Sequence, residues 1–134
     1  MRAEYSKFDS RSKEAFNTAQ LGAVLARRQE YLLPLQFDSK GADVLAYNPA
    51  TNESRPIQVK SRATVDAKYA NKGLWIAFPH WVNDSQQDWY VVPHDELNRL
   101  WGRRTDRDKW SSGSPSKALL NALADYRVGS VALG

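Results

Sequence analysis

The chain has 134 residues, of which 42% are hydrophobic and 25% are charged, a balance typical of one soluble globular domain. It contains no cysteine, which excludes disulfides, thiolate zinc sites and cysteine catalysis. Nineteen Lys and Arg against fifteen Asp and Glu give a net charge of +4, which favours polyanionic partners without requiring one. No secretory signal and no apolar run of about 20 residues is present. We therefore expect one soluble, cytoplasmic domain over residues 1–134, without a membrane partner.

The first predicted element is a helix over residues 11–28, which follows two residues that can cap a helix, Asp9 and Ser10. Residues spaced at 100° intervals form one broad apolar side of this helix. Its members are Phe16, Ala19, Ala23 and Val24. Gln20 falls between Phe16 and Val24 on that side, so the sequence predicts that Gln20 points inward.

Strand-like segments follow the helix. The run EYLLPLQF (30–37) predicts a short strand that ends or bends at Pro34, and DSKG (38–41) predicts a loop. Next, ADVLAYN (42–48) and RPIQVKSR (55–62) flank PATNES (49–54), whose Pro, Asn and Ser predict a hairpin loop.

The second half is less regular. ATVDAKYANK (63–72) is consistent with a short helix or an ordered loop, and LWIAF (74–78) and DWYVV (88–92) predict two strands. HDELNRLW (94–101) predicts a helix that begins at Asp95, and a last helix is expected from Lys117 to Tyr126. This order predicts an α/β or α+β sheet layered with helices.

Polar residues interrupt both strands of the predicted hairpin. Side chains alternate across a strand, so Gln58 and Lys60 share one face. A six-residue loop would pair Asn48 with Arg55 and place Asp43 directly across from Lys60. The sequence therefore predicts one patch that contains Asp43, Gln58 and Lys60.

Two interpretations of this patch remain open from the residues alone. A cross-strand ion pair between Asp43 and Lys60 would stabilise the hairpin by about 0.2 to 1 kcal/mol, but it leaves the face of Leu45 and Tyr47 exposed. Alternatively, a carboxylate, an amide oxygen and a backbone carbonyl are oxygen ligands suited to Mg²⁺. A nearby ammonium would then stabilise the charge on a phosphate or orient a water.

The motif GADVLAY, followed after the hairpin by IQVKS, resembles the PD-(D/E)XK nuclease superfamily, which includes restriction-endonuclease-like and Holliday-junction-resolvase-like proteins. The variant is the one in which Gln replaces the acid before x-Lys. AQLGAVLARRQEYLLPLQ resembles the preceding helix and strand, and DWYVVPHDEL resembles a later strand, so the resemblance covers roughly residues 12–98. It implies an αβββαβ core, with a mixed central sheet flanked by helices, and Mg²⁺- or Mn²⁺-dependent endonuclease hydrolysis of DNA.

The resemblance also implies roles for individual residues. Asp43 would be the main metal-ligating carboxylate, and Gln58 would replace the second acid. Val59 would ligate the metal through its backbone carbonyl, and Lys60 would be the catalytic lysine. Many such nucleases dimerise to cut two strands, so the resemblance is compatible with a homodimer.

The family usually carries a Glu on the first helix, and the best-aligned position here is Gln20. Glu14 lies six residues earlier, about 240° around the helix, and is not expected to take the same direction. Asp43 would then be the only carboxylate on the metal. The alternative function is therefore a weakened or inactive nuclease-fold module that binds nucleic acid or serves as a subunit of a larger complex.

Other features offer further candidates. Between Trp101 and Trp110 lies a basic segment suited to phosphate contact and base stacking, although a solvated loop explains it equally well. Its candidate nucleic-acid-binding residues are Arg103, Arg104, Arg107 and Lys109. Neither His80 nor His94 is expected to be catalytic, and His94 is expected to act locally at the start of a helix. A protein-interaction domain also stays open, since a charge of +4 is modest.

Overall fold

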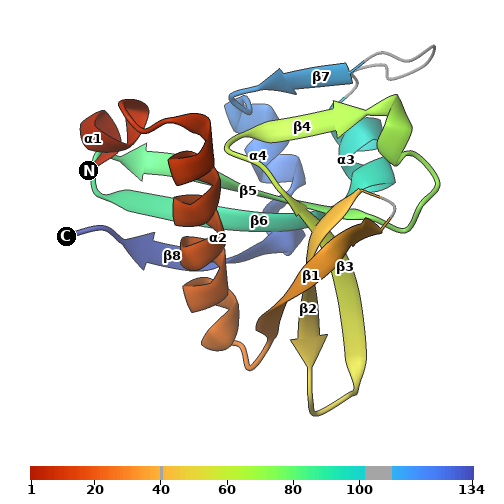
Figure 1. Cartoon of the computed structure of the whole chain (residues 1–134). Helices are drawn as coiled ribbons and strands as arrows, with labels where there is room; N and C mark the ends of the chain where they lie inside the picture. Colours follow the sequence, from red (N-terminus) through yellow and green to blue (C-terminus); the bar gives the residue numbers. More distant parts are fainter. Residues whose placement is uncertain (40, 102–109) are drawn as a thin grey trace.

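The computed structural model of the chain describes residues 1–39, 41–101 and 110–134, and it shows a mixed sheet layered with helices (Figure 1). The described α-helices are α1 (Arg2–Ser6), α2 (Ser10–Ala26), α3 (His94–Trp101) and α4 (Lys117–Ala122). The described strands are β1 (Tyr31–Ser39), β2 (Ala42–Asn48), β3 (Glu53–Val59), β4 (Ala63–Asp66), β5 (Trp75–Asn83), β6 (Gln86–Pro93), β7 (Trp110–Gly113) and β8 (Arg127–Ala132). Two 3₁₀ turns, η1 (Ala67–Tyr69) and η2 (Ala124–Tyr126), complete the order.

Six strands form the main sheet in the order β1-β2-β3-β5-β6-β8. β1, β2 and β3 form an antiparallel meander, β3 and β5 run parallel, and β5, β6 and β8 are antiparallel. The parallel pair requires a crossover, and β4 with η1 provides it. β4 itself pairs with β7 in a separate two-stranded ribbon (Figure 1).

Alternating side chains of the sheet build one core on each face. In β5, Ala77 belongs to the core beneath α2, whereas Ile76 and Phe78 belong to the core beneath α3 and α4. The first core also contains Leu21, Val24, Leu25, Ile57, Val59, Trp89 and Val91. The second also contains Val65, Tyr69, Tyr90, Val92, Leu97, Leu119 and Leu123. The sheet is therefore covered on both faces, which agrees with the expected layered α/β class.

Helix α2 begins as predicted, but its buried face is rotated relative to the predicted one. The Asp9 side chain caps it by accepting a hydrogen bond from the Ser12 backbone N–H at 2.7 Å, and this bond lowers the pKa of Asp9. The buried residues are Asn17, Leu21, Val24 and Leu25, whereas Ala19 and Ala23 are exposed. The predicted apolar side was therefore right for Val24 and for Phe16, which packs partly buried against the core, but wrong for Ala19 and Ala23. Leu21 and Leu25 decide the orientation, since each buries far more apolar area than an alanine does.

The hairpin forms, but its register differs from the prediction by two residues. Asn48 pairs with Glu53 rather than with Arg55, so the loop has four residues instead of six. Asn52 takes a left-handed conformation with φ of 58°, which asparagine tolerates, and this closes the shorter loop. A shift of two preserves the faces, because side chains alternate with a period of two. Asp43, Gln58 and Lys60 therefore still share a face.

Other segments extend the predictions. β1 does not end at Pro34, which pairs with Val44 at the sheet edge, but its pairing with β2 is irregular between Pro34 and Ser39, where an end or a bend was predicted. β1 also continues to Ser39, into residues 38–41, which were predicted as a loop. Residues 63–72, left open between helix and loop, contain β4 and η1. The last helix ends at Ala122 rather than Tyr126, and the strand that follows, β8, was not predicted. Within the part of the chain that the structure describes, no helix has the length and apolar character needed to cross a lipid bilayer.

Candidate functional site

The candidate site begins where the pairing of β2 and β3 ends. The last paired residues there are Val44 and Ile57. Beyond them, the Val59 N–H donates a hydrogen bond to Asp43 Oδ2 at 3.3 Å, so a carboxylate occupies the place of a strand carbonyl. The separation of the strands exposes polar side chains at this rim without leaving the Val59 N–H unpaired.

The backbone of β3 directs the Val59 carbonyl to the same rim. The N–H and C=O groups of one strand residue point to the same side, and those of the next residue point to the other. The Val59 N–H faces Asp43, whereas the Lys60 N–H donates to the Ala77 carbonyl at 2.8 Å on the β5 side. The Val59 carbonyl is therefore directed toward the side of Asp43.

A hollow of about 250 Å³ lies at this rim, between the hairpin and the first half of α2. The hairpin side is lined by Asp43, Gln58, Val59, Lys60 and Ser61. The α2 side is lined by Ser10, Lys13, Glu14 and Asn17. The structure thus brings four predicted site residues together, whereas Gln20 does not line this hollow.

Glu14 is exposed, but it lines the hollow because it points in nearly the same direction from α2 as the buried Leu21. It precedes the fully buried Leu21 by seven residues, and seven steps of about 100° return to within about 20° of the same direction. Glu14 was expected to point elsewhere because its direction around the helix was compared with that of Gln20. Gln20, however, is not at the centre of the buried face. The first half of this side of the helix is polar and lines the hollow, and the second half is apolar and packs on the sheet.

Asn17 forms part of the buried base of this hollow and is 2% exposed. Its Nδ2 donates to the Tyr5 hydroxyl at 2.9 Å. Its Oδ1 is buried with no hydrogen-bond partner among the residues that the structure describes. A buried amide oxygen of this kind can accept a hydrogen bond or ligate a cation, and the described fold does not use that capacity.

The donors around the hollow fit a hard divalent cation. Asp43 and Glu14 offer carboxylates, Gln58 offers an amide oxygen, and Val59 offers a carbonyl. All are oxygen ligands, which Mg²⁺ and Mn²⁺ favour. Among the described residues, no cluster of three or more His, Cys, Asp or Glu could hold a metal. A cation here would thus have at most two carboxylates and would rely on amide and carbonyl oxygens.

Two lysines, Lys60 and Lys68, lie near the ring of Tyr69, which lines a hollow together with Asp43. The Lys60 and Lys68 ammonium nitrogens lie 5.7 Å and 5.2 Å from the centre of its ring. Tyr69 is 5% exposed, and burial raises the pKa of its hydroxyl. The Lys68 charge opposes this rise, whereas the carboxylates of Asp66 and Asp43 add to it. The Tyr69 hydroxyl therefore stays protonated at neutral pH and can donate a hydrogen bond.

Gly41 allows Tyr69 to approach the start of β2. Its φ of +91° is in the left-handed region, where glycine carries no steric cost. A Cβ on Gly41 would lie 2.9 Å from two carbons of the Tyr69 ring. A second hollow, of about 440 Å³, lies here and is lined by Gly41, Asp43, Gln58, Lys60, Lys68, Tyr69 and Lys72.

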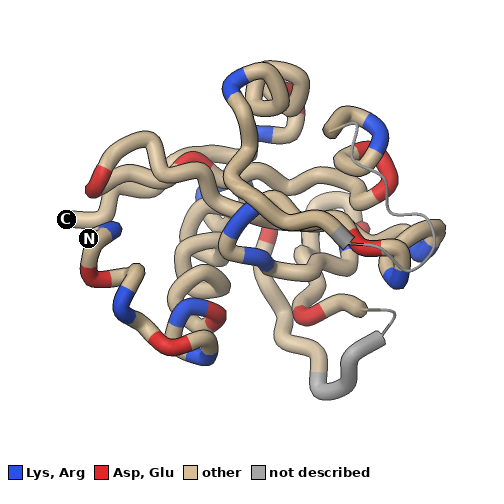
Figure 2. Tube along the Cα trace, turned by 90° about the horizontal axis from the view of Figure 1, so that it is seen from above, with Lys and Arg blue, Asp and Glu red and all other residues tan. Residues whose placement is uncertain are grey.

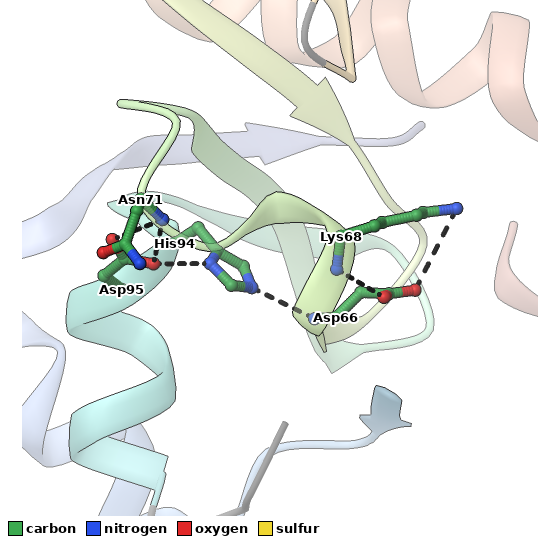
Figure 3. Close-up of polar contacts among 5 residues, drawn as sticks. All are labelled: Asp66, Lys68, Asn71, His94 and Asp95. Carbon is green, nitrogen blue, oxygen red and sulfur yellow. Dashed lines mark hydrogen bonds and ion pairs between the residues drawn. The ribbon is translucent and has the colours of Figure 1, made fainter. Parts of the chain in front are cut away.

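A buried histidine anchors the segment that carries Lys68 and Tyr69 (Figure 3). His94 is 1% exposed, and its Nε2 accepts a hydrogen bond from the Asp66 backbone N–H at 3.0 Å. The Nδ1 atom therefore carries the proton, and it donates to Asp95 Oδ1 at 2.9 Å. Asp95 Oδ2 also accepts from the Asn71 N–H at 3.1 Å. The start of α3 thus holds both ends of the η1 segment.

Four hollows adjoin one another along this face. Ser61 and Lys13 connect the Asp43 hollow to one lined by Arg2, Arg62, His80 and Trp81. Lys60 connects it to the Tyr69 hollow and to one lined by Thr64, Asp66 and Ser112. The basic residues of this groove are Arg2, Lys13, Lys60, Arg62, Lys68 and Lys72, and its acidic residues are Glu14, Asp43 and Asp66.

The groove therefore has an excess of positive charge on both sides of Asp43. Lys and Arg occur on several separate segments and are interspersed with Asp and Glu along the chain (Figure 2), so folding rather than one run of charge assembles the groove. Lys13, Lys68 and Lys72 were not predicted from the sequence. The only local signal was the helical spacing that places Lys13 three residues after Ser10 and four before Asn17.

The basic residues predicted from the sequence, Arg103, Arg104, Arg107 and Lys109, lie outside the described residues. His80 lines the hollow beside Trp81. His94 has the local role expected at the start of a helix. Comparisons of this chain with protein-family models, with curated proteins and with solved structures give no match.

Proposed function

We propose that the chain is a metal-dependent endonuclease of the PD-(D/E)XK kind that hydrolyses DNA phosphodiester bonds. One observation carries the proposal: Asp43, Glu14, Gln58, Val59 and Lys60 line one hollow within a groove whose other charged residues are mainly basic. An oxygen-donor site, a lysine and a surface for a polyanion are the three parts that phosphodiester hydrolysis requires.

The order of the elements supports the family assignment as a proposal. A helix, an antiparallel meander and a strand parallel to β3 follow one another as in the αβββαβ core. The crossover between β3 and β5 departs from that pattern, because it contains β4 and η1 where the family has a helix.

Each residue has a role in this reaction. Asp43, Glu14, Gln58 and the Val59 carbonyl would hold Mg²⁺ or Mn²⁺, which supplies Lewis-acid polarisation of a phosphoryl oxygen. Lys60 stabilises the negative charge that develops on the phosphate and orients the attacking water. The water oxygen forms a bond to phosphorus and one O–H bond of the water breaks. The bond from phosphorus to one deoxyribose oxygen breaks, and that oxygen takes up one proton, so that one water yields a phosphate monoester and a deoxyribose hydroxyl.

A specific observation also favours a second function. The hollow offers at most two carboxylates, from Asp43 and Glu14, and its other oxygen ligands are neutral, so a divalent cation would depend partly on substrate phosphates. The alternative is a nuclease-fold module that binds nucleic acid through the basic groove without cutting it, or that acts as a subunit of a larger complex.

The test incubates the protein with supercoiled, linear duplex, single-stranded and branched DNA in Mg²⁺ or Mn²⁺. We expect cutting of at least one form, and its loss in EDTA. Asp43→Ala and Lys60→Ala should each lower the rate by about 100-fold or more. Because Asp43→Ala also removes the acceptor of the Val59 N–H, a thermal melt must show that this variant is still folded at the assay temperature. The exposed Asp125 and Arg27 do not line the groove, so Asp125→Ala and Arg27→Ala are the matched controls.

Intact DNA in every condition would refute the endonuclease. DNA binding that weakens as salt rises and that survives Asp43→Ala would then favour the non-cutting module.

A further inference from the structure

The hollow beside Trp81 differs in chemistry from the rest of the groove. It has a volume of about 340 Å³, and it adjoins the Asp43 hollow through Lys13 and Ser61. Its lining contains two aromatic rings, from Tyr5 and Trp81, together with Arg2, Arg62 and His80. The other three hollows contain one aromatic residue, Tyr69, which is 5% exposed. Tyr5 is also buried, at 7% exposed, so it supports the partly exposed ring of Trp81, which is the ring available to a ligand.

The aromatic and cationic groups of this hollow are held together by the fold. The Tyr5 and Trp81 rings lie 5.4 Å apart, centre to centre, and the Arg2 guanidinium lies 6.0 Å from the Trp81 ring. The Arg2 backbone N–H donates to the Asp84 carbonyl at 3.0 Å, which fixes α1 against the turn between β5 and β6. Lys13 Nζ lies 5.4 Å from the Tyr5 ring, on the border with the Asp43 hollow.

This combination suits one nucleotide whose base is not stacked in a duplex. Aromatic rings and arginine planes bind the flat face of a base, and every base offers such a face once it is unpaired. Lys13 and Arg62 provide positive charge for the phosphates on either side of that base. A fully paired duplex presents mainly phosphates to such a groove and would leave the aromatic surface unused.

We propose that the Trp81 hollow binds a single unpaired nucleotide adjacent to the phosphate at Asp43. The substrate class is therefore single-stranded DNA, or duplex DNA that contains a bulge or a flap. The position of the cut relative to this nucleotide rests on the proposed nuclease function, whereas the binding of the nucleotide does not.

The test measures binding without metal, in EDTA, by fluorescence anisotropy. The probes are a blunt duplex, the same duplex with a one-nucleotide bulge, and a single strand of the same length. We expect the bulged duplex to bind about ten-fold or more tightly than the blunt duplex, the contribution of one base stack. Arg2→Ala should remove most of that difference, whereas Arg27→Ala, about 21 Å further along α2 than Lys13, should preserve it.

Trp81 packs partly against the core, so its removal risks unfolding. Trp81→Phe keeps an aromatic ring and should retain part of the preference. Trp81→Leu should lose it, with thermal melts showing which variants are folded. The bulged probe should also quench tryptophan fluorescence in the wild type, and less so in Trp81→Phe.

Equal affinity of the wild type for bulged and blunt duplexes would overturn the inference, as would a preference that persists in Arg2→Ala. Failure of cleavage with the bulge preference intact would refute only the nuclease. Equal cutting of all DNA forms without a bulge preference would refute only this inference.

Discussion

At the scale of single residues, Glu14 changes the chemistry expected of the site. With Gln20 on the helix, Asp43 would be the only carboxylate near a metal, whereas Glu14 lines the same hollow as Asp43 and provides a second one. The negative charge available to a cation therefore doubles, and affinity for a divalent ion depends strongly on the number of charged ligands.

Glu14→Gln should therefore raise the Mg²⁺ concentration needed for half-maximal cutting by about ten-fold or more, because one carboxylate ligand becomes neutral. Gln20→Ala should leave that concentration unchanged, since Gln20 does not line the hollow. The measurement is a titration of the cleavage rate with Mg²⁺ for the wild type and both variants. If Gln20→Ala raised that Mg²⁺ concentration more than Glu14→Gln does, the metal site would include Gln20 rather than Glu14.

The sequence predicts the patch of Asp43, Gln58 and Lys60 more robustly than it predicts the contribution of the helix. The predicted hairpin register was off by two residues, but side chains alternate across a strand with a period of two, so the same residues still share a face. The face that a helix residue occupies is more sensitive to such an error, because the side-chain direction rotates by about 100° with each residue. The predicted face included Ala19 and Ala23 and left out Leu21 and Leu25, so it was rotated away from Glu14.

At the scale of elements, long-range pairing decides what the local sequence leaves ambiguous. Residues 63–72 have no clear periodicity, and β4 becomes a strand because Ala63 to Asp66 pair with Trp110 to Gly113. β8 was missed for the same reason, since it is a strand only beside β6. The stronger local patterns, those of β2, β3, β5 and β6, could be predicted from their apolar runs and turn residues.

His94 links this nonlocal crossover to the site. His94→Ala would leave the partly buried Asp66 N–H without its acceptor and would remove a fully buried ring, so the free energy of unfolding should fall by about 1 to 3 kcal/mol. The η1 segment should also loosen, which would weaken DNA binding through Lys68. Hydrogen exchange checks this prediction: the amides of residues 66–71 should exchange faster, and those of β2 and β3 should not.

Asp95→Asn is the control, because its one carbonyl oxygen, placed as Oδ1 is now, can still accept from His94 Nδ1 and from the Asn71 N–H, which keeps the His94 bond to Asp66 in place. It should change exchange in residues 66–71 less than His94→Ala does. Uniform acceleration of exchange over the whole sheet in His94→Ala would show a global loss of stability and would contradict a local anchoring role.

At the scale of the whole molecule, the net charge of +4 is modest, but the charged residues that line the groove are mostly basic. Six basic and three acidic residues line the connected hollows, and they come from segments between Arg2 and Lys72. Composition could indicate a polyanionic partner, but only the fold could show which cations act together. Lys60 was found from its motif, whereas Lys68 and Lys72 lie in the segment whose structure the sequence left open.

The salt dependence of DNA binding tests whether these cations form one surface. Each phosphate that a cation neutralises adds about 0.7, for single strands, to 0.9, for duplexes, to the slope of log affinity against log salt concentration. Contact through all six basic residues would give a slope of about −4 on a single strand, measured in EDTA so that cutting cannot interfere. Lys68→Ala should reduce the magnitude of the slope by about 0.7, and Lys13→Ala combined with Lys68→Ala by about 1.4, because the two lysines lie on different hollows of the same groove.

Arg27→Ala removes the same charge outside the groove and should leave the slope unchanged. An equal reduction in Arg27→Ala would mean that DNA responds to overall charge, and the groove would then have no special part in binding.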